Sequence, residues 1–424
     1  MQNDNVKLKI LILGGGFGGV RCALDLEKKL KNKVLAGQVE ITLIDKNSWH
    51  LFVPALYEVA SAYGVKKDPF ATRLKKTICI PYSNIFENKK INFVQAEIYS
   101  VDLENRKVAT SGGEVMDYDY LVIALGSQPA DFAIPGVKEY AFQFKYINDA
   151  LMLNQKIDEL TKEVAVGARS KPVKIAIVGA GFTGIELAAE LACCVKKLAK
   201  ACNIKGRCER IMLLEAGPKI LPAVSDKERA IILERLTHLG VEVMENVAAE
   251  EVRNNYIKLK NGKEIEAELM IWTAGVRLPE LLERTSFLPL TEKKKIKVNN
   301  GLEADGLAGV FAVGDNTEFI DLKTSKPVPA LAYVAVDQGR IAAKNIIRLI
   351  NNKKPVAYGP FYSVWIAPVG GKFALARLWG INIKGFWGWL LRELVDFKYM
   401  LSILSINKAI SIMWQEITLF TKND

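Results

Sequence analysis

The chain of 424 residues has few of the side chains that hydrolases and metalloenzymes rely on. It contains two histidines, so neither a histidine-based metal site nor a Ser-His-Asp triad is expected, and we predict no metal. Its six cysteines form no C-x-x-C pair and no disulfide ladder, and we predict reduced, buried thiols. These cysteines are Cys22, Cys79, Cys193, Cys194, Cys202 and Cys208.

Long apolar runs are also missing. No stretch reaches the ~18 uncharged apolar residues of a spanning helix, and we expect no secretory signal, because the apolar residues 8–13 end in glycines and are typical of a buried strand. The net charge of +11 favours an anionic partner such as a phosphate-rich cofactor or an anionic membrane face. No nucleic-acid-binding motif accompanies this charge, so nucleic acid is not expected.

A strand–glycine turn–helix–strand unit occurs twice. The first comprises residues 7–13, 14–19, 20–30 and 39–45, and the second comprises residues 173–178, 179–184, 185–198 and 210–215. Apolar strands that alternate with helices predict parallel sheets covered on both faces. We therefore predict an α/β fold with two Rossmann-type dinucleotide-binding domains.

Each turn has the pattern G-x-G-x-x-G after a buried strand and at the start of a helix. Gly14 permits the tight turn, Gly16 lacks a Cβ that would collide with a diphosphate, and Gly19 lets the helix approach the strand. The helix N terminus then offers N–H groups and a positive dipole end to the diphosphate. The same positions in the second copy are held by Gly179, Gly181 and Gly184.

An acid ends the second strand of each unit. Asp45 and Glu215 stand where a carboxylate can accept hydrogen bonds from a ribose. A carboxylate at Glu215 would repel a 2′-phosphate, so we expect NADH rather than NADPH. A packing role for the glycines is the alternative, and it becomes weak when two copies occur in the same context.

These motifs resemble those of two-dinucleotide-binding-domain flavoproteins, and most of all type II (non-proton-pumping) NADH:quinone oxidoreductases. Four further segments carry the resemblance, at residues 49–57, 118–127, 270–275 and 309–315. The resemblance implies FAD and NADH as cofactors. It assigns the first repeat to FAD and the second to NAD.

The resemblance also implies the cofactor residues. Those for FAD are Gly14, Gly16, Phe17, Gly18, Gly19, Asp45, Lys46, Gly126, Gly314 and Asp315. Asp315 resembles the aspartate that hydrogen-bonds the ribityl or phosphate region, and we expect a helix N terminus after it; a plain cap is the alternative. Those for NAD are Gly179, Gly181, Phe182, Thr183, Gly184, Glu215, Ala274 and Gly275.

Glu186 is the predicted catalytic residue. From the sequence alone we place it in the first turn of the NAD helix, where a carboxylate balances the helix dipole. The resemblance adds a position beside nicotinamide and flavin, where Glu186 would supply protons. Both roles stay open at this point.

Residues 329–339 resemble the quinone-site helix of the family, with Ala332, Tyr333, Ala335, Asp337 and Gln338 as predicted substrate residues. Small residues on one face let a flat ring approach the flavin. The sequence departs from the family pattern here, because Tyr333 and Asp337 replace two glutamines. Tyr333 can still hydrogen-bond a quinone carbonyl, and ordinary helix packing is the alternative.

Residues 386–424 form an aromatic, amphipathic pair of predicted helices. They include Trp387, Trp389 and Trp414, and tryptophan favours an interface that is apolar on one side and wet on the other. Four charged residues at 392–398 argue against a span, so we expect helices that lie in the membrane surface. A homodimer surface or a core helix is the alternative.

The sequence thus predicts an FAD-binding domain (1–145 and 278–385), an NAD(H)-binding domain (146–277) and membrane-associating helices (386–424). We expect a peripheral enzyme on the cytoplasmic side of the inner membrane that passes electrons from NADH to menaquinone or ubiquinone without pumping protons. Other readings are a sulfide:quinone or ferredoxin/rubredoxin reductase and a redox-sensing NADH-binding flavoprotein of low turnover. Disulfide reductases need a cysteine pair near the flavin, and the sequence has none.

Overall fold

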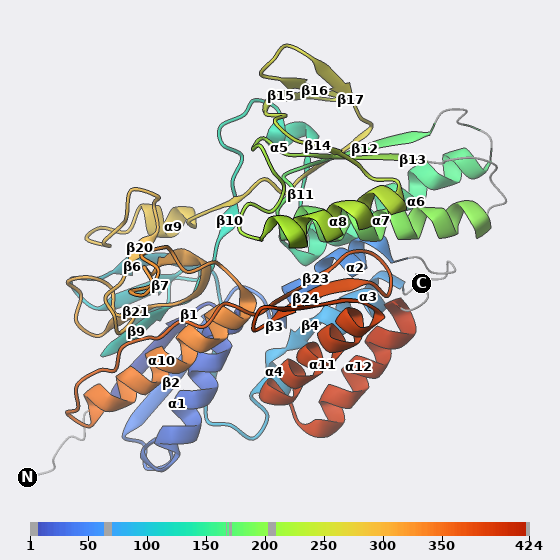
Figure 1. Ribbon diagram of the computed structural model, residues 1–424. Helices are drawn as coiled ribbons and strands as arrows, with labels where there is room; N and C mark the ends of the chain where they lie inside the picture. The colour runs from blue at the N-terminus through green and yellow to red at the C-terminus, as the bar shows by residue number, and fades with distance from the viewer. Residues whose placement is uncertain (1–6, 63–69, 167, 169–171, 202–208, 421–424) are drawn as a thin grey trace, which may run out of the picture. The chain divides into compact units, whose positions relative to one another are not determined.

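The computed structural model describes residues 7–62, 70–166, 168, 172–201 and 209–420 (Figure 1). Its contacts divide the chain into two compact units. Unit 1 contains Met1–Leu51, Cys79–Gln128 and Arg277–Tyr362, and unit 2 contains Phe52–Ile78, Pro129–Val276 and Ser363–Asp424. Unit 2 therefore holds the second glycine turn together with the chain's end, whereas the sequence suggested a separate domain for residues 386–424. The predicted domain boundaries stay a proposal.

Unit 1 is built on a five-stranded parallel sheet in the order β21-β9-β1-β2-β5. The strands are β1 (Leu8–Leu13), β2 (Val39–Asp45), β5 (Asn92–Gln95), β9 (Tyr120–Ile123) and β21 (Val310–Ala312). β1 is central because its last four residues are fully apolar and buried, as expected for a strand covered on both faces. The predicted strands 7–13 and 39–45 are confirmed.

Two long helices pack together in this unit, α1 (Phe17–Leu35) and α10 (Ala332–Ile350) (Figure 1). Their close approach depends on glycines, because a Cβ on Gly339 would collide with the Gly18 backbone. Smaller sheets pair β3 (Trp49–Leu51) with β4 (Cys79–Pro81), β6 (Ile98–Asp102) with β7 (Lys107–Thr110) and β8 (Val115–Asp117), and β20 (Ile296–Lys297) with β22 (Thr317–Glu318).

Unit 2 repeats the design with a five-stranded parallel sheet in the order β11-β18-β12-β13-β14. Its strands are β11 (Phe142–Gln143), β12 (Val173–Val178), β13 (Glu209–Leu214), β14 (Glu242–Met244) and β18 (Leu269–Trp272). The helices are α6 (Ile147–Ala165), α7 (Phe182–Ala201) and α8 (Asp226–Leu239). The second predicted unit is therefore confirmed, and so is the α/β fold class.

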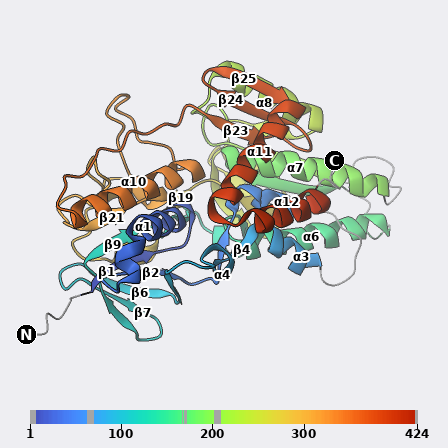
Figure 2. The same cartoon turned by 90° about the horizontal axis from the view of Figure 1, so that it is seen from below.

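The rest of unit 2 includes two antiparallel sheets and the helices α2 (Leu56–Ser61), α3 (Phe70–Ile78), α11 (Phe386–Ile403) and α12 (Ile406–Phe420). β15 (Ala249–Arg253), β16 (Tyr256–Leu259) and β17 (Glu264–Glu266) form one sheet, and β23 (Trp365–Pro368), β24 (Ala374–Leu378) and β25 (Ile381–Gly385) form the other. α11 packs on β24 and α12, and α12 contacts α3, as Figure 2 shows. α2 packs on α6 and α7. No helix within the described ranges is long and apolar enough to cross a membrane.

Candidate functional site

The first glycine turn joins β1 to α1 in the predicted way. Gly14 has φ +97°, which favours glycine, and a Cβ there would lie 2.5 Å from the Ala124 carbonyl oxygen. A Cβ on Gly19 would collide with the Gly14 carbonyl. A Cβ on Gly16, in contrast, would meet nothing within 4 Å. The turn is thus closed by protein at two glycines and open at the third, where an anion would lie.

The start of α1 has the features of an anion site. Gly16 is the N-cap residue, no side chain caps the helix, and the first turn carries no acid. The N–H groups of a helix's first turn have no partner within the helix itself, and the helix dipole favours negative charge there. The open Cβ position of Gly16 and this uncapped end therefore fit a dinucleotide diphosphate.

Asp45 holds the same turn. Its Oδ2 accepts a hydrogen bond from Gly15 N at 2.7 Å, and its Oδ1 accepts one from Asn47 N at 2.8 Å. A carboxylate oxygen can accept more than one hydrogen bond, so Asp45 can still receive a ribose hydroxyl. The predicted neighbour Lys46 is exposed beside it.

Two residues that were not among the predicted site residues hold the other side of the Gly15 peptide. The Gly15 carbonyl accepts from Tyr82 Oη at 2.8 Å and from His50 Nδ1 at 3.0 Å. Because a carbonyl only accepts, His50 Nδ1 carries the hydrogen. Burial lowers the pKa of His50 to about 4, so the ring is neutral. The Phe17 ring packs edge-on against it. His50 lies in a segment that carried the resemblance, whereas nothing in the sequence signalled Tyr82.

The Gly314–Asp315 segment lies at the end of β21, in the short helix η2 (Gly314–Asn316). Asp315 Oδ2 accepts from Ser127 Oγ at 2.8 Å, and Asn316 Oδ1 accepts from Gly126 N at 2.9 Å. Two separate chain segments with predicted FAD residues are thereby joined. The buried Asn316 was missed, because only the fold brings it to Gly126.

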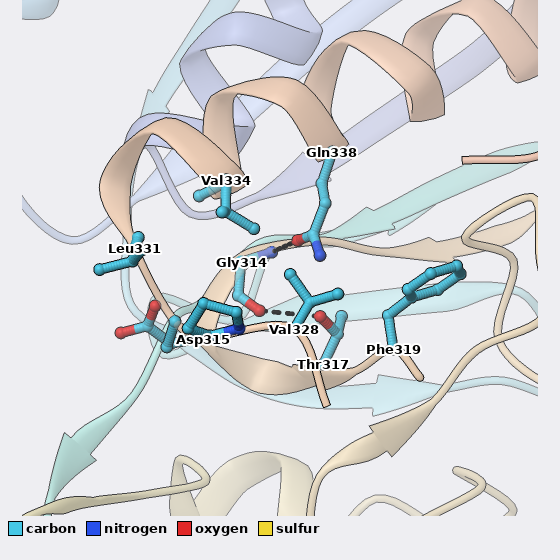
Figure 3. Close-up of a pocket in the computed structure, with 11 residues that line it drawn as sticks. Gly314, Asp315, Thr317, Phe319, Val328, Leu331, Val334 and Gln338 are labelled. Carbon is cyan, nitrogen blue, oxygen red and sulfur yellow. Dashed lines mark hydrogen bonds between the residues drawn. The ribbon is translucent and has the colours of Figure 1, made fainter. Parts of the chain in front are cut away.

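The helix expected after Asp315 does not follow at once. η2 is followed by β22 and a loop, and the next long helix, α10, begins at Ala332. The turn is held instead by the partners of Gly314, whose N donates to Gln338 Oε1 at 2.7 Å and whose O accepts from Thr317 Oγ1 at 2.8 Å (Figure 3).

A small pocket lies between this turn and the start of α10 (Figure 3). Asp315, Leu331, Val334, Ala335 and Gln338 are among its lining residues. The pocket thus joins a predicted FAD residue to two predicted quinone residues.

The other predicted quinone residues lie on the first turns of α10. Ala332 is half-buried, and Asp337 lies 3.6 Å from Arg340. Tyr333 is 37% exposed, and burial, followed by the nearby Asp337 carboxylate, raises the pKa of its hydroxyl. Tyr333 therefore keeps its proton and can donate a hydrogen bond.

The second glycine turn reproduces the first. Gly179 has φ +105°, and its Cβ would meet the Ala274 backbone. A Cβ on Gly184 would collide with the Gly179 carbonyl, whereas one on Gly181 would meet nothing within 4 Å. Thr183 is exposed beside this opening. A second diphosphate thus fits by the same geometry.

Glu215 holds this turn as Asp45 holds the first. Its Oε2 accepts from Ala180 N at 2.9 Å, and its Oε1 accepts from Gly217 N at 2.8 Å. The carbonyl of Gly275, the last predicted NAD residue, accepts from Ala130 N at 3.0 Å. The acid therefore shapes the turn in both copies, a role that the sequence motif did not reveal.

Glu186 is the fifth residue of α7, so it does not lie in the first helical turn as expected; that turn carries no acid. The dipole-balancing interpretation is thereby removed. Removal from water raises the pKa of Glu186 to about 8; Arg392 opposes the rise, and Asp396 and Glu58 add to it. Glu186 is therefore mostly protonated at neutral pH, as a proton donor must be.

Three of the four cysteines that the structure describes, Cys22, Cys79 and Cys194, are buried thiols as predicted, and Cys193 is half-buried. Burial, together with the neighbouring Asp25, raises the pKa of the Cys22 thiol, so this cysteine is a poor nucleophile. Cys202 and Cys208 lie outside the described residues. No group of metal-ligating side chains was found among the described residues.

Residues 8–339 match the family described as pyridine nucleotide-disulphide oxidoreductase. The chain belongs to this family. Among curated relatives, proteins named type II NADH:quinone oxidoreductase from Staphylococcus haemolyticus and Staphylococcus epidermidis are 28% and 29% identical to this chain. Each match covers 95% of this chain and 97% of the relative.

Solved structures share the fold of this family member. NDH2 from Plasmodium falciparum in complex with NADH has a TM-score of 0.81 at 20% identity, covering 98% of this chain and 97% of that one. The sulfide:quinone oxidoreductase from Aquifex aeolicus has a TM-score of 0.75 at 22% identity, covering 93% and 90%. At such identities the likeness concerns the fold alone.

Proposed function

We propose that the protein is an FAD-dependent NADH:quinone oxidoreductase that takes hydride from NADH and passes two electrons to a membrane quinone without pumping protons. The observation that carries the proposal is the pair of glycine turns, each open at its middle glycine and held by an acid. Relatives with this activity in their names match nearly the whole chain, which supports the same reading.

In unit 1 the residues act by binding and orientation. The N terminus of α1 at Gly16 holds the FAD diphosphate, Asp45 its adenosine ribose, and Asp315 the ribityl region. FAD, when bound, supplies the hydride acceptance and electron transfer that no side chain provides. His50 and Tyr82 keep the Gly15 peptide in place, so the turn needs no rearrangement on binding.

In unit 2 the N terminus of α7 at Gly181 holds the NADH diphosphate. The Glu215 carboxylate disfavours a 2′-phosphate, so the donor is NADH. Glu186 donates the proton that the reaction requires, since it is neutral at neutral pH. On α10, Tyr333 donates a hydrogen bond to a carbonyl of a menaquinone or ubiquinone, and the small Ala332 and Ala335 leave room for its ring.

Anaerobic stopped-flow spectroscopy tests this function. NADH should bleach the flavin absorbance of FAD-loaded protein, and a short-chain quinone should restore it within the turnover time. NADPH should bleach it more slowly. The proposal would be contradicted if NADH left the flavin oxidised, or if quinone reoxidised it no faster than buffer does. Reoxidation by a ferredoxin instead would favour a ferredoxin reductase.

The outward face of α11 and α12 supports attachment to a bilayer surface. Apolar side chains are exposed along both helices: Phe386, Trp387, Leu394, Val395, Leu401, Ile406, Ile410, Trp414 and Ile417. The charged Arg392 and Asp396 lie on the buried face instead. An exposed apolar surface of this extent marks an interaction site, and tryptophans suit a membrane interface. Since NADH is cytoplasmic, the proposed location is the cytoplasmic side of the inner membrane.

Flotation with phospholipid vesicles tests this attachment. Trp387 and Trp414 are each 68% exposed, and a Trp387→Ser/Trp414→Ser double variant should leave the vesicles while it keeps NADH-dependent flavin reduction. Tyr99→Ser, a change at an aromatic side chain that is 75% exposed in β6, is the matched control. If the double variant instead separates a dimer and floats normally, the surface joins two copies of the chain.

A further inference from the structure

The buried faces of α11 and α12 carry ionisable side chains where amphipathic helices usually place apolar ones. On α11 the buried positions are Gly388, Arg392, Asp396, Met400 and Ile403. On α12 the buried residues Ala409, Met413, Glu416 and Leu419 form the corresponding stripe. Charged residues are almost never fully buried unless they are paired, so this placement calls for a reason.

One guanidinium serves several acids in this cluster. Arg392 Nη1 lies 2.5 Å from Glu58 Oε1 and 3.4 Å from Glu393 Oε1, and Arg392 Nε lies 3.3 Å from Asp396 Oδ2. Tyr57 Oη donates to Glu58 Oε1 at 2.9 Å. The cluster thus brings together side chains from α2 and α11.

Two buried atoms of the cluster have no hydrogen-bond partner among the described residues. They are Arg392 Nη2 and Glu416 Oε2, in side chains that are only 6% and 4% exposed. A buried polar atom without a partner costs free energy, so Arg392 Nη2 is suited to donate to a water molecule, and Glu416 Oε2 is suited to accept from one or to carry a proton. Glu416 on α12 can therefore exchange a proton with such a water molecule.

The cluster extends to α7. Glu58, Arg392 and Asp396 act electrostatically on Glu186, and the charged groups that act on Glu416 are Glu58, Asp396, Arg392 and Glu393. Glu186 and Glu190 also act electrostatically on Tyr57, and Glu190 Oε2 accepts a hydrogen bond from Gly371 N. Since α2 packs on α7 and α11 packs on α12, the ionisable groups of these four helices lie in one packed region and influence the proposed proton donor electrostatically.

More acidic than basic side chains are buried here, because Glu58, Asp396 and Glu416 lie near one guanidinium, that of Arg392. Burial favours the neutral forms of two of these acids: it raises the pKa of Asp396 to about 6 and that of Glu416 above its ordinary value. Titrations of such neighbours are coupled, so one proton can be held by the set rather than by a single acid.

The proposed reaction consumes one proton from water in each turnover. NADH transfers a hydride, which carries two electrons and one hydrogen, and the quinone needs two electrons and two protons to become a quinol. The balance is NADH + H⁺ + quinone → NAD⁺ + quinol. The half-buried Glu186, as the proposed donor, must therefore be reprotonated once per cycle.

We propose that Glu416 and Asp396, beside the Arg392–Glu58 ion pair, form a proton relay that recharges Glu186 from the side of the C-terminal helices. This inference rests on the proposed function. Glu186 gives its proton to the reduced acceptor and becomes a carboxylate. Asp396 then passes its proton to Glu186 and takes one from Glu416, and water protonates Glu416, so protons balance and no bond between heavy atoms changes.

The test separates the two half-reactions in the FAD-loaded full-length protein. Glu416→Gln and Asp396→Asn keep size and hydrogen-bonding capacity but carry no transferable acid proton. Bleaching of the flavin by NADH should keep its wild-type rate, while the quinone-dependent step should slow by about 100-fold or more. The slowed step should show a larger solvent deuterium isotope effect and a rate that falls steadily as pH rises. Glu264→Gln, a change at an exposed acid of β17, is the matched control.

Infrared difference spectroscopy of the wild type gives a second readout that needs no stable variant. Quinone addition to the NADH-reduced protein should change the protonated-carboxyl stretch. The relay would be overturned if both variants kept the wild-type rate of the quinone step, its isotope effect and its pH profile. Equal slowing of both half-reactions would also overturn it, because that result indicates a structural role. Failure of NADH to reduce the wild-type flavin would instead refute the proposed function.

Discussion

Replacing the middle glycine of each turn by alanine should separate cofactor binding from folding. Gly16 has φ −71° and ψ −167°, which alanine adopts easily, and its Cβ would meet no protein atom within 4 Å. Gly16→Ala should therefore leave apoprotein stability unchanged or raise it by about 0.4–1 kcal/mol through the unfolded chain. A bound diphosphate would meet the new methyl group. Such overpacking costs about 1–3 kcal/mol, so the Kd for FAD should rise about 10–100-fold.

Fluorescence titration with FAD and thermal unfolding of the apoprotein measure the two effects separately. Gly181→Ala is the matched variant in the second turn: it should weaken NADH binding and leave FAD binding unchanged. Gly19→Ala should instead destabilise the apoprotein, because its Cβ would collide with the Gly14 carbonyl. Wild-type FAD affinity in Gly16→Ala would refute the placement of the diphosphate.

Three further predictions concern single side chains. Arg392→Met leaves buried carboxylates without their guanidinium and should lower the free energy of unfolding in urea by about 3–5 kcal/mol, whereas Lys297→Met, at an exposed ion pair, should change it by less than about 1 kcal/mol. Burial raises the pKa of Glu186 from 4.5 to about 8, so the folded chain keeps a proton that the unfolded chain releases. The stability that depends on this proton is lost as pH rises through 8. The free energy of urea unfolding of the wild type should therefore be lower at about pH 9 than at about pH 5, and Glu186→Gln should lack this part of the decrease. Tyr333→Phe should raise the quinone KM several-fold at an unchanged rate of flavin reduction by NADH, and an unchanged KM would remove the hydroxyl from the quinone site.

Local signals in the sequence determined the two βαβ units. The strands at 39–45 and 173–178 were predicted at their observed bounds, because a short apolar run followed by glycines has few alternatives. The glycine positions were equally clear, since the local turn itself requires them: Gly14 has φ +97°, and a Cβ on Gly19 would collide with the Gly14 carbonyl. The terminal helices also followed from their amphipathic pattern.

Contacts between distant segments were decided only by the tertiary structure. Tyr82 reaches the Gly15 carbonyl across 67 positions, and no local pattern specifies such a pair. The acids Asp45 and Glu215 were assigned to the ribose, yet each also fixes the turn that precedes it by a hydrogen bond that forms only when the strands align. The charges of α11 were expected in the plane of a membrane surface, and the fold turns Arg392 and Asp396 inward. A helical pattern gives the spacing of side chains, whereas the face that becomes buried depends on what packs against it.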